Sequence, residues 1–157
     1  MADLRWWRET TPIGELTITV GDLGVRSIER DGLAPERGYE ECDAELQDEL
    51  HEYFAGERRS FTIPFDLSSV RGDASRRILE TLAGSVPHGT TVGYGELATR
   101  AGHPGAARAV GQAMARNPIP LVIPCHRVIG SAGVIGGFGW GVDTKRWLLR
   151  HEGVQWV

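Results

Sequence analysis

Residues 117–128 read Asn-Pro-Ile-Pro-Leu-Val-Ile-Pro-Cys-His-Arg-Val, an apolar run that contains three prolines and leads into a cysteine and a histidine. Proline fixes its own φ angle and pushes the preceding residue toward extended geometry. The prolines therefore exclude a helix over this run and disfavour a central paired strand. A stiff segment of this kind presents the Cys125 thiol at a defined place. Thiolate is the reactive form of cysteine, and a neighbouring imidazole such as that of His126 favours it.

A second interpretation of Cys125 is structural. Free cysteine is among the residue types most often buried, and it usually behaves as a small, inert hydrophobe. A histidine beside a cysteine does not by itself separate a nucleophile from a core residue. The motifs that flank the pair do separate the two interpretations.

Five further motifs occur in order on the two sides of Cys125. They are TPIGEL at 11–16, VPHGT at 86–90, YGELA at 94–98, AARAVG at 106–111 and WLLRHEG at 147–153. Together with PCHRV at 124–128, they resemble the O6-alkylguanine-DNA alkyltransferases, and PCHRV resembles the active-site signature of that family. The resemblance spans nearly the whole chain and is densest from about residue 86 onward.

Acidic and basic residues are distributed unequally between the two halves of the chain. Residues 1–70 carry 7 Lys/Arg and 16 Asp/Glu, a net charge of −9, whereas residues 71–157 carry 10 and 5, a net charge of +5. This asymmetry is typical of a protein of which one part contacts nucleic acid, although chance segregation of surface charge produces the same counts. We expect two domains: an acidic α/β scaffold at 1–70 and a DNA-binding, alkyl-accepting domain at 71–157.

Length and composition are those of an ordinary globular protein. The 157 residues suffice for one or two small domains with a core. No apolar run reaches transmembrane length, and the first residues lack the apolar region of a signal peptide. Two cysteines, Cys42 and Cys125, do not make a disulfide framework. We therefore expect no membrane partner and a reducing, cytoplasmic setting.

The acidic half predicts a small antiparallel sheet with one helix. Polar and apolar residues alternate over 5–30 with turn residues between the runs, which predicts a β-meander. The following segments predict a polar loop at 31–41, a helix at 43–54 and a short edge strand at 61–65. The family resemblance implies a ribonuclease H-like fold for this domain. Cys42 lacks the Cys/His spacing of a zinc site, so we expect no metal.

The basic half predicts a mainly helical domain. Helices are predicted at 73–84, at 91–102 with Gly102 ending the helix, and at 106–116 with Pro104 at the helix start. The last two form a helix-turn-helix pattern, and the resemblance implies a winged helix-turn-helix. The segment at 106–116 is rich in alanine, and small residues permit close approach to a narrow groove.

By resemblance, the helix at 106–116 enters the minor groove of DNA, and Arg108 fills the gap left by an extruded nucleotide. A surface ion pair is the alternative interpretation of Arg108. The residues expected to contact DNA are Tyr94, Ala106, Ala107, Arg108 and Gly111.

Six glycines fall between residues 130 and 141. Neither dinucleotide-binding nor Walker spacing is present, so we interpret this segment as a close-fitting lid over a ligand. Asp143 and Thr144 are expected to cap a final helix that ends near Glu152. The resemblance implies a substrate pocket formed by Pro120, Val128, Phe138, Gly139 and Trp140.

The lid departs from the family pattern at two positions. Phe138 stands where the family usually has a tyrosine, and Trp140 stands where a small residue is common. Gly93 likewise replaces the more usual hydroxyl residue before Tyr94. O6-methylguanine is expected to remain a substrate, and the acceptance of larger groups is left open.

The resemblance implies direct-reversal DNA repair. The Cys125 sulfur, as thiolate, attacks the alkyl carbon on guanine O6 after the nucleotide has rotated out of the duplex. His126 takes the thiol proton, and Glu152 orients His126. Asn117 hydrogen-bonds around the Cys125 turn, and Tyr94 holds the nucleotide and donates a proton to the leaving guanine.

A thioether has no ready route back to a thiol, so the transfer is expected to be irreversible and stoichiometric. We expect no cofactor. The expected partner is double-stranded DNA that contains O6-alkylguanine, bound by a monomer.

Three other functions fit parts of the sequence. A lesion sensor would bind alkylguanine without transferring the group, and the altered lid keeps this alternative open. A Cys/His hydrolase would need an oxyanion pocket and would leave the helix-turn-helix pattern without a role. A regulator that signals through a methylated cysteine would need a second DNA-binding or activation domain, which no segment resembles.

Overall fold

The structure, a computed structural model, describes residues 3–157, and these residues form two compact units. Unit 1 comprises residues 3–69 together with Pro118–Pro120. Unit 2 comprises Val70–Asn117 and Leu121–Val157. The roles assigned above to residues 1–70 and 71–157, scaffold and DNA binding, stay predictions, as does the ribonuclease H-like description.

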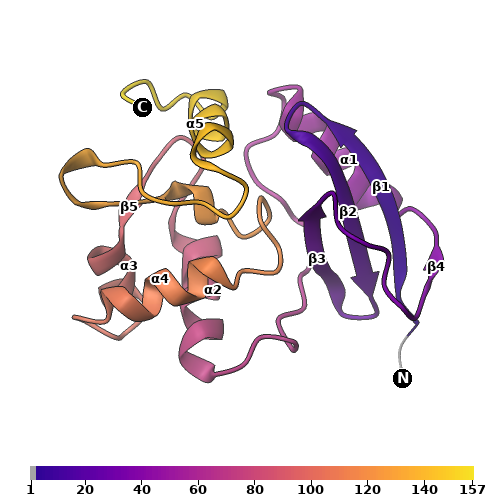
Figure 1. Cartoon of the computed structure of the whole chain (residues 1–157), viewed down its shortest axis with the longest axis horizontal. Coiled ribbons are helices and arrows are strands. Elements are labelled where there is room, and N and C mark those ends of the chain that lie inside the picture. Colours follow the sequence, from indigo (N-terminus) through magenta and orange to yellow (C-terminus); the bar gives the residue numbers. More distant parts are fainter. Residues whose placement is uncertain (1–2) are drawn as a thin grey trace. The chain divides into compact units, whose positions relative to one another are not determined.

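Unit 1 is built on the predicted β-meander. Its first three strands are β1 (Arg5–Thr11), β2 (Gly14–Gly21) and β3 (Gly24–Arg30), paired antiparallel (Figure 1). Helix α1 (Ala44–Phe54) begins after Asp43, whose carboxylate accepts a hydrogen bond from the Leu46 backbone N–H at 3.1 Å. The core of the unit consists of buried apolar residues of the sheet and of α1, among them Leu16, Ile18, Val25, Ile28, Leu46, Leu50 and Tyr53.

The sheet of unit 1 is mixed, so the prediction of a purely antiparallel sheet is wrong in one respect. A short strand, β4 (Tyr39–Glu40), pairs parallel with β1 and makes the strand order β3-β2-β1-β4. The loop after β3 crosses to the far edge of the sheet, so that β4 arrives running in the same direction as β1. The Tyr39 backbone N–H donates to the Leu4 carbonyl and that of Glu41 to the Trp6 carbonyl, each at 3.0 Å.

The strand predicted at 61–65 does not form. The buried Glu49 carboxylate accepts hydrogen bonds from the backbone N–H groups of Thr62, at 2.8 Å, and Ile63, at 3.0 Å. Those N–H groups are therefore not available to a β-ladder. Pairing in this segment is limited, within the described residues, to an isolated bridge between Phe65 and Val25.

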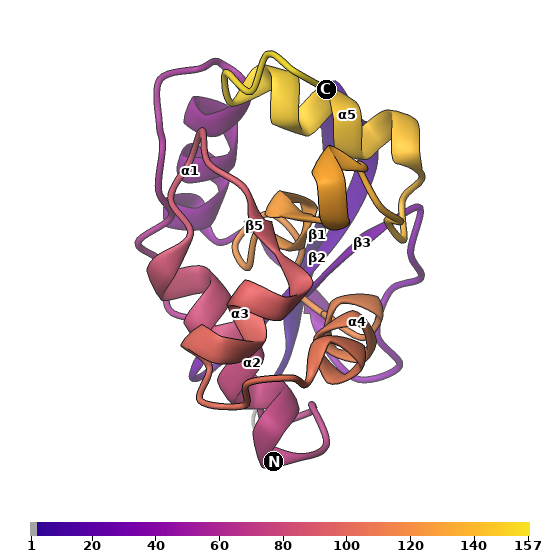
Figure 2. The same cartoon turned by 90° about the vertical axis from the view of Figure 1, so that its left-hand side faces the viewer.

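Unit 2 is mainly helical, as predicted. Its elements are α2 (Asp73–Ser85), β5 (Val92–Gly93), α3 (Tyr94–Arg100), α4 (Ala107–Ala115), β6 (Val128–Ile129) and α5 (Val142–His151). Helices α2, α3 and α4 lie together, and α5 lies on the other side of the β5–β6 pair (Figures 1 and 2). Buried residues of the helices, including Ile78, Leu79, Leu82, Leu97, Val110, Leu148 and Leu149, form the core.

Three predicted boundaries in unit 2 differ from the structure. Val92 and Gly93 pair in parallel with β6 instead of starting a helix. The winged helix-turn-helix description stays a prediction. Pro104 lies in a turn between Gly102 and Gly105, which have φ angles of 83° and 82°, and α4 begins only after that turn. Helix α5 begins after Gly141 without a side-chain cap. The expected cap residue, Asp143, instead pairs with Arg146 in the first turn.

Across residues 3–157, no helix is both long enough and apolar enough to cross a membrane.

Candidate active site

A cavity of about 320 Å³ lies beside Cys125 in unit 2. It is formed by α3, α4, the 3-10 turn Cys125–Arg127 and the glycine-rich loop that follows β6. Its lining residues are Tyr94, Gly111, Met114, Ala115, Cys125, Gly137, Phe138 and Gly139. Sites for small molecules usually have volumes of about 300–1,000 Å³, so this cavity belongs to the lower end of that range.

Glycines leave open space around the cavity. A Cβ atom added to Gly111, Gly137 or Gly139 would meet no atom within 4 Å. Side chains at these three positions would therefore project into open space, and all three positions line the cavity. The loop approaches the rest of unit 2 closely at Gly136, where an added Cβ would lie 3.3 Å from Lys145 Nζ and 3.4 Å from the Tyr94 hydroxyl.

Backbone geometry holds Cys125 at the cavity wall. Leu121, between Pro120 and Pro124, adopts the left-handed conformation with a φ angle of 75°, which is costly for a bulky residue. Asn117 Nδ2 donates to the Ile123 carbonyl at 2.9 Å. The Cys125 backbone N–H donates to the same carbonyl at 2.8 Å. The Ile123 carbonyl therefore accepts two hydrogen bonds just before Cys125, and Cys125 itself is buried.

The Cys125 thiol is neutral in the resting protein. Burial raises the pKa of this thiol to about 11, against the lowering effects of the hydrogen bond with Asn117 and of the positive charge of Lys145. A base is therefore needed to generate the nucleophile.

His126, the residue after Cys125, forms a buried hydrogen-bonded pair with Glu152. His126 Nε2 lies 2.7 Å from Glu152 Oε2, and both side chains are fully buried. Burial lowers the pKa of His126, although Glu152 raises it. Burial alone would raise the pKa of Glu152, but His126 and then Arg127 hold it well below its ordinary value. The ionised carboxylate only accepts hydrogen bonds, so Nε2 carries the proton and donates it to this bond.

The other ring nitrogen of His126 is consequently an unprotonated acceptor. Among residues 3–157, no hydrogen-bond partner reaches this buried Nδ1 atom. Most buried polar atoms have a hydrogen-bond partner, and this unpaired nitrogen is chemically able to accept a proton.

Arg127 is a buried member of the site that the sequence analysis did not assign. Its Nε atom donates to Glu152 Oε1 at 2.7 Å, and its Nη2 atom donates to Glu152 Oε2 at 3.1 Å. The available signal was a charged residue inside an otherwise apolar motif, directly after His126.

Lys145 is the second residue that the sequence analysis missed. It is fully buried on α5, and its Nζ atom donates to the carbonyls of Val128, at 2.6 Å, and Gly137, at 3.1 Å. Burial lowers the pKa of Lys145 to about 8, and the charge of Cys125 opposes this effect. The sequence signal was its helical spacing with Leu148 and Glu152, which places all three on one face of α5.

The structure brings only some of the predicted pocket residues to the cavity. Phe138 and Gly139 line it. Pro120 belongs to unit 1, and Val128 is fully buried in β6. The Trp140 ring packs edge-on against the Phe138 ring, with centroids 5.9 Å apart. Within the described part of the chain, Pro120, Val128 and Trp140 are not among the lining residues.

The predicted DNA-contacting residues lie at α3 and α4. Tyr94 and Gly111 line the cavity, whereas Ala107 and Arg108 are exposed and Ala106 is half-buried. Arg108 forms no ion pair or hydrogen bond with any residue of 3–157. The surface ion pair considered above for Arg108 is therefore not formed.

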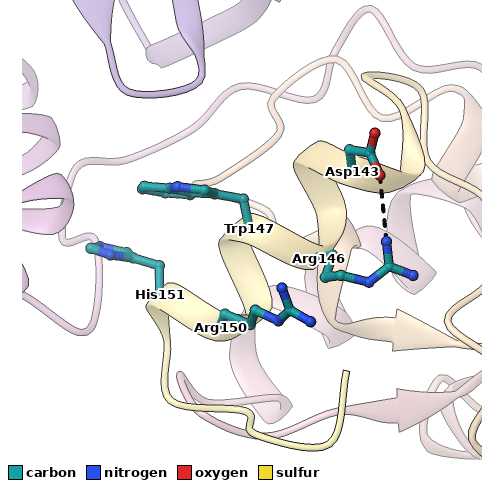
Figure 3. Close-up of a pocket in the computed structure, with 5 residues that line it drawn as sticks. All are labelled: Asp143, Arg146, Trp147, Arg150 and His151. Atoms are coloured by element: carbon teal, nitrogen blue, oxygen red, sulfur yellow. Dashed lines mark hydrogen bonds and ion pairs between the residues drawn. The ribbon is translucent and has the colours of Figure 1, made fainter.

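A second hollow, of about 550 Å³, lies along α5 (Figure 3). Its lining residues are Asp143, Arg146, Trp147, Arg150 and His151. The rings of Trp147 and His151 stack with centroids 4.8 Å apart. No cysteine lines it, so the cavity beside Cys125 is the candidate active site. Residues 3–157 contain no group of three or more His, Cys, Asp or Glu side chains placed to hold a metal ion.

Comparisons with known proteins agree with this geometry. A protein-family model described as "6-O-methylguanine DNA methyltransferase, DNA binding domain" matches residues 73–154. A methylated-DNA–protein-cysteine methyltransferase of Shigella flexneri is 47% identical over 122 residues, which cover 74% of this chain and 69% of the relative. A protein of the same name from Mycolicibacterium paratuberculosis is 40% identical over 148 residues, which cover 90% of this chain and 88% of the relative.

The fold is also similar to that of a solved structure. The crystal structure of Mycobacterium tuberculosis OGT in complex with DNA matches with a TM-score of 0.81 and 37% sequence identity. The match covers 96% of this chain and 92% of that chain.

Proposed function

Because this chain belongs to the methylated-DNA–protein-cysteine methyltransferase family, its function is direct-reversal DNA repair by alkyl transfer, and we propose that Cys125 accepts the alkyl group. The protein is a single-turnover enzyme. One observation carries the proposal for Cys125. This residue lines a cavity large enough for a base, and the next residue in the chain is a histidine whose Nδ1 atom has no hydrogen-bond partner among residues 3–157.

The proposed reaction uses the thiol, the imidazole and the carboxylate in turn. Glu152 accepts the Nε2–H of His126, so Nδ1 takes the proton of Cys125, directly or through one water. The thiolate attacks the alkyl carbon, and an S–C bond forms as the C–O6 bond breaks. The electron pair of the broken bond stays on guanine O6. The charge of Lys145, which lowers the pKa of Cys125, stabilises the thiolate before attack.

Tyr94 is proposed to donate a hydrogen bond to the leaving guanine. It lines the cavity with Cys125. Burial raises the pKa of Tyr94, and the charge of Cys125 raises it further. The hydroxyl therefore stays protonated and acts as a donor to the anionic leaving group.

The proposed partner is double-stranded DNA that contains O6-alkylguanine. The start of helix α4 presents two small residues, Ala107 and the preceding Ala106, which permit close approach of the helix to the duplex. Arg108, exposed and without an ion pair among the described residues, is proposed to fill the gap that the extruded nucleotide leaves. All residues proposed to act on the alkyl group and on the proton belong to unit 2 of one chain, which supports action as a monomer.

Alkyl preference is proposed to depend on the apolar lid. Phe138 lines the cavity, and Trp140 supports the Phe138 ring through an edge-to-face contact. This pair limits how far the lid yields to a larger group. We therefore propose that a methyl group is transferred more readily than a benzyl group.

Intact-mass spectrometry tests the proposed function. After incubation with a duplex that contains one O6-methylguanine, we expect the protein to gain the mass of one methyl group and no more. A duplex with O6-benzylguanine should react more slowly, because Phe138 and Trp140 occupy the lid. A duplex with unmodified guanine is the control. Tight binding to the methylated duplex without any gain of mass would contradict the proposal and favour a lesion-binding protein.

Alkylation of Cys125 is expected to destabilise the protein. The Cys125 side chain is buried, and an added carbon that the neighbouring atoms cannot accommodate without moving costs about 1–3 kcal/mol. For a chain of this size, each kcal/mol lowers the melting temperature by about 2–4 °C. The measurement is a thermal melt of the protein before and after reaction. The Cys125→Ala variant treated with the same duplex should show no shift. An unchanged or higher melting temperature of the alkylated protein would contradict this expectation.

A further inference from the structure

Arg127 makes more directed hydrogen bonds than any step of the proposed reaction requires. It is buried, and its guanidinium donates three hydrogen bonds. Nε and Nη2 bind the two oxygens of Glu152, at 2.7 and 3.1 Å, and Nη1 binds the Val86 carbonyl at 2.8 Å. The guanidinium therefore joins the Cys125–Arg127 turn to the end of α5 and to the residue that follows α2.

These contacts fix the Glu152 carboxylate in one plane. Oε1 accepts from Arg127, and Oε2 accepts from both Arg127 and His126. Two parallel N–H···O bonds between a guanidinium and a carboxylate fix the orientation of the carboxylate and also strengthen the ion pair. A carboxylate held in this way stays ionised and accepts hydrogen bonds only. His126 must then keep its proton on Nε2 and leave Nδ1 bare.

We propose that Arg127 is a positioning residue for alkyl transfer: its guanidinium holds Glu152 so that His126 stays a neutral base protonated on Nε2. This inference rests on the proposed roles of Cys125, His126 and Glu152. In this proposal Arg127 acts in two ways. The two N–H groups of its planar guanidinium, here called the fork, orient the Glu152 carboxylate, and its positive charge keeps that carboxylate ionised. Lysine retains the charge but not the fork, and methionine retains neither, so substitutions separate the two tasks.

The charges around His126 determine the direction of the expected pH effect. Cys125 and Arg127 lie on its own turn, and Lys145 and Glu152 face it from α5. Burial lowers the pKa of His126, Glu152 raises it, and the positive charges of Arg127 and Lys145 lower it. Removal of the Arg127 charge should therefore raise the pKa of His126. More of the imidazole is then protonated at a given pH, and less of it is available as a base.

The experiment measures the rate of methyl transfer to Cys125 from a duplex that contains O6-methylguanine. Rates are taken by intact mass from about pH 5 to about pH 9, the range in which histidine acts as a switch. The proteins are the wild type, Arg127→Lys, Arg127→Met and a control, Arg58→Lys. Arg58 in unit 1 also binds a carboxylate and a carbonyl, with Nε at 3.2 Å from Glu52 Oε2 and Nη1 at 3.0 Å from the Ser60 carbonyl.

Each variant has a distinct expected result. Arg127→Met should react about 10- to 100-fold more slowly at neutral pH, and the acidic limb of its pH profile should move to higher pH. Arg127→Lys should react about tenfold more slowly with the acidic limb in place, because only the fork is lost. Arg58→Lys should match the wild type in rate and profile.

Two outcomes would overturn the inference. One is an acidic limb in folded Arg127→Met that coincides with that of the wild type. The other is a transfer rate in Arg127→Lys equal to that of the wild type. If Arg127→Met does not fold, nitrogen NMR of the His126 ring in Arg127→Lys decides: a mixture of the two tautomers supports the inference, and Nε2–H alone overturns it. A wild-type protein that gains no methyl mass would instead refute the proposed function.

Discussion

Replacement of Cys125 with alanine should abolish alkyl transfer. Of the residues that line the cavity, Cys125 alone carries a side chain that becomes a strong nucleophile on deprotonation, since Tyr94 stays protonated. We expect the rate to fall by at least about 10³-fold, as is usual when the nucleophile of a covalent mechanism is removed. The readout is the absence of any added methyl mass after prolonged incubation with an O6-methylguanine duplex.

Cys42→Ala is the matched control for that variant. Cys42 lies in unit 1, where burial and then the carboxylates of Glu9, Asp43 and Asp48 raise the pKa of its thiol. Cys42 is therefore a poor nucleophile, and its removal should leave transfer unchanged. Fluorescence anisotropy should show that Cys125→Ala still binds the duplex, so that the loss concerns chemistry alone. Methyl mass on Cys125→Ala, or no transfer by Cys42→Ala, would refute the assignment of the acceptor.

Replacement of Glu152 with alanine should cause a large loss of stability. Its carboxylate is the buried partner of His126, at 2.7 Å, and of the Arg127 guanidinium, at 2.7 and 3.1 Å. Removal of one partner of a buried ion pair leaves the other charge, here that of Arg127, buried without compensation. This typically lowers the free energy of unfolding by about 3–5 kcal/mol. Urea unfolding of the wild type and of Glu152→Ala measures this difference in the free energy of unfolding.

Glu96→Ala is the control for Glu152→Ala. Glu96 pairs with Arg100 at 2.8 Å on the surface of α3, where 59% and 36% of the two side chains are exposed. The two ion pairs are almost equally short, so burial is what separates them. Loss of the surface pair should change the free energy of unfolding by less than about 1 kcal/mol. Equal losses in the two variants would show that the buried network does not contribute as the geometry indicates.

The same network gives a pH dependence of stability with a definite sign. The pKa of Glu152 is lowered in the folded protein from an ordinary value of 4.5. A lowered pKa contributes stability that is present above pH 4.5 and is lost as the pH falls further. Urea unfolding at several acidic pH values should therefore show a smaller acid-induced loss in Glu152→Ala than in the wild type. This comparison belongs to the same experiment and checks that the carboxylate acts in its ionised form.

The resting state of the site has a consequence for selectivity. A buried thiol with a pKa of about 11 is a weak nucleophile toward reagents in solution. His126, which we propose as the base for this thiol, is buried in the same unit. Transfer is thus favoured only when a substrate holds its alkyl carbon against the sulfur, since proximity then compensates for the small fraction of thiolate.

Local sequence patterns were sufficient to predict the family and many of the elements. The ordered motifs around PCHRV predicted the family, which is confirmed. The alternation over 5–30 predicted the three antiparallel strands, and helices were predicted where α1 and α2 lie. These predictions succeed because strand alternation, helical periodicity and proline geometry depend on neighbours within a few residues.

Other features were decided by contacts between segments that are distant in the sequence. The Glu49 carboxylate accepts hydrogen bonds from the backbone N–H groups of Thr62 and Ile63. The segment at 61–65 therefore does not form the strand that its sequence pattern predicted. Likewise, the positions of Arg127 and Lys145 in the chain do not identify their partners. Both are buried in the fold, where Arg127 meets Glu152 from 25 residues away. Local pattern specifies which backbone conformations are favoured. The burial of a charge and the choice of its partner depend on which surfaces the folded chain brings together, because desolvation is set by all surrounding segments at once.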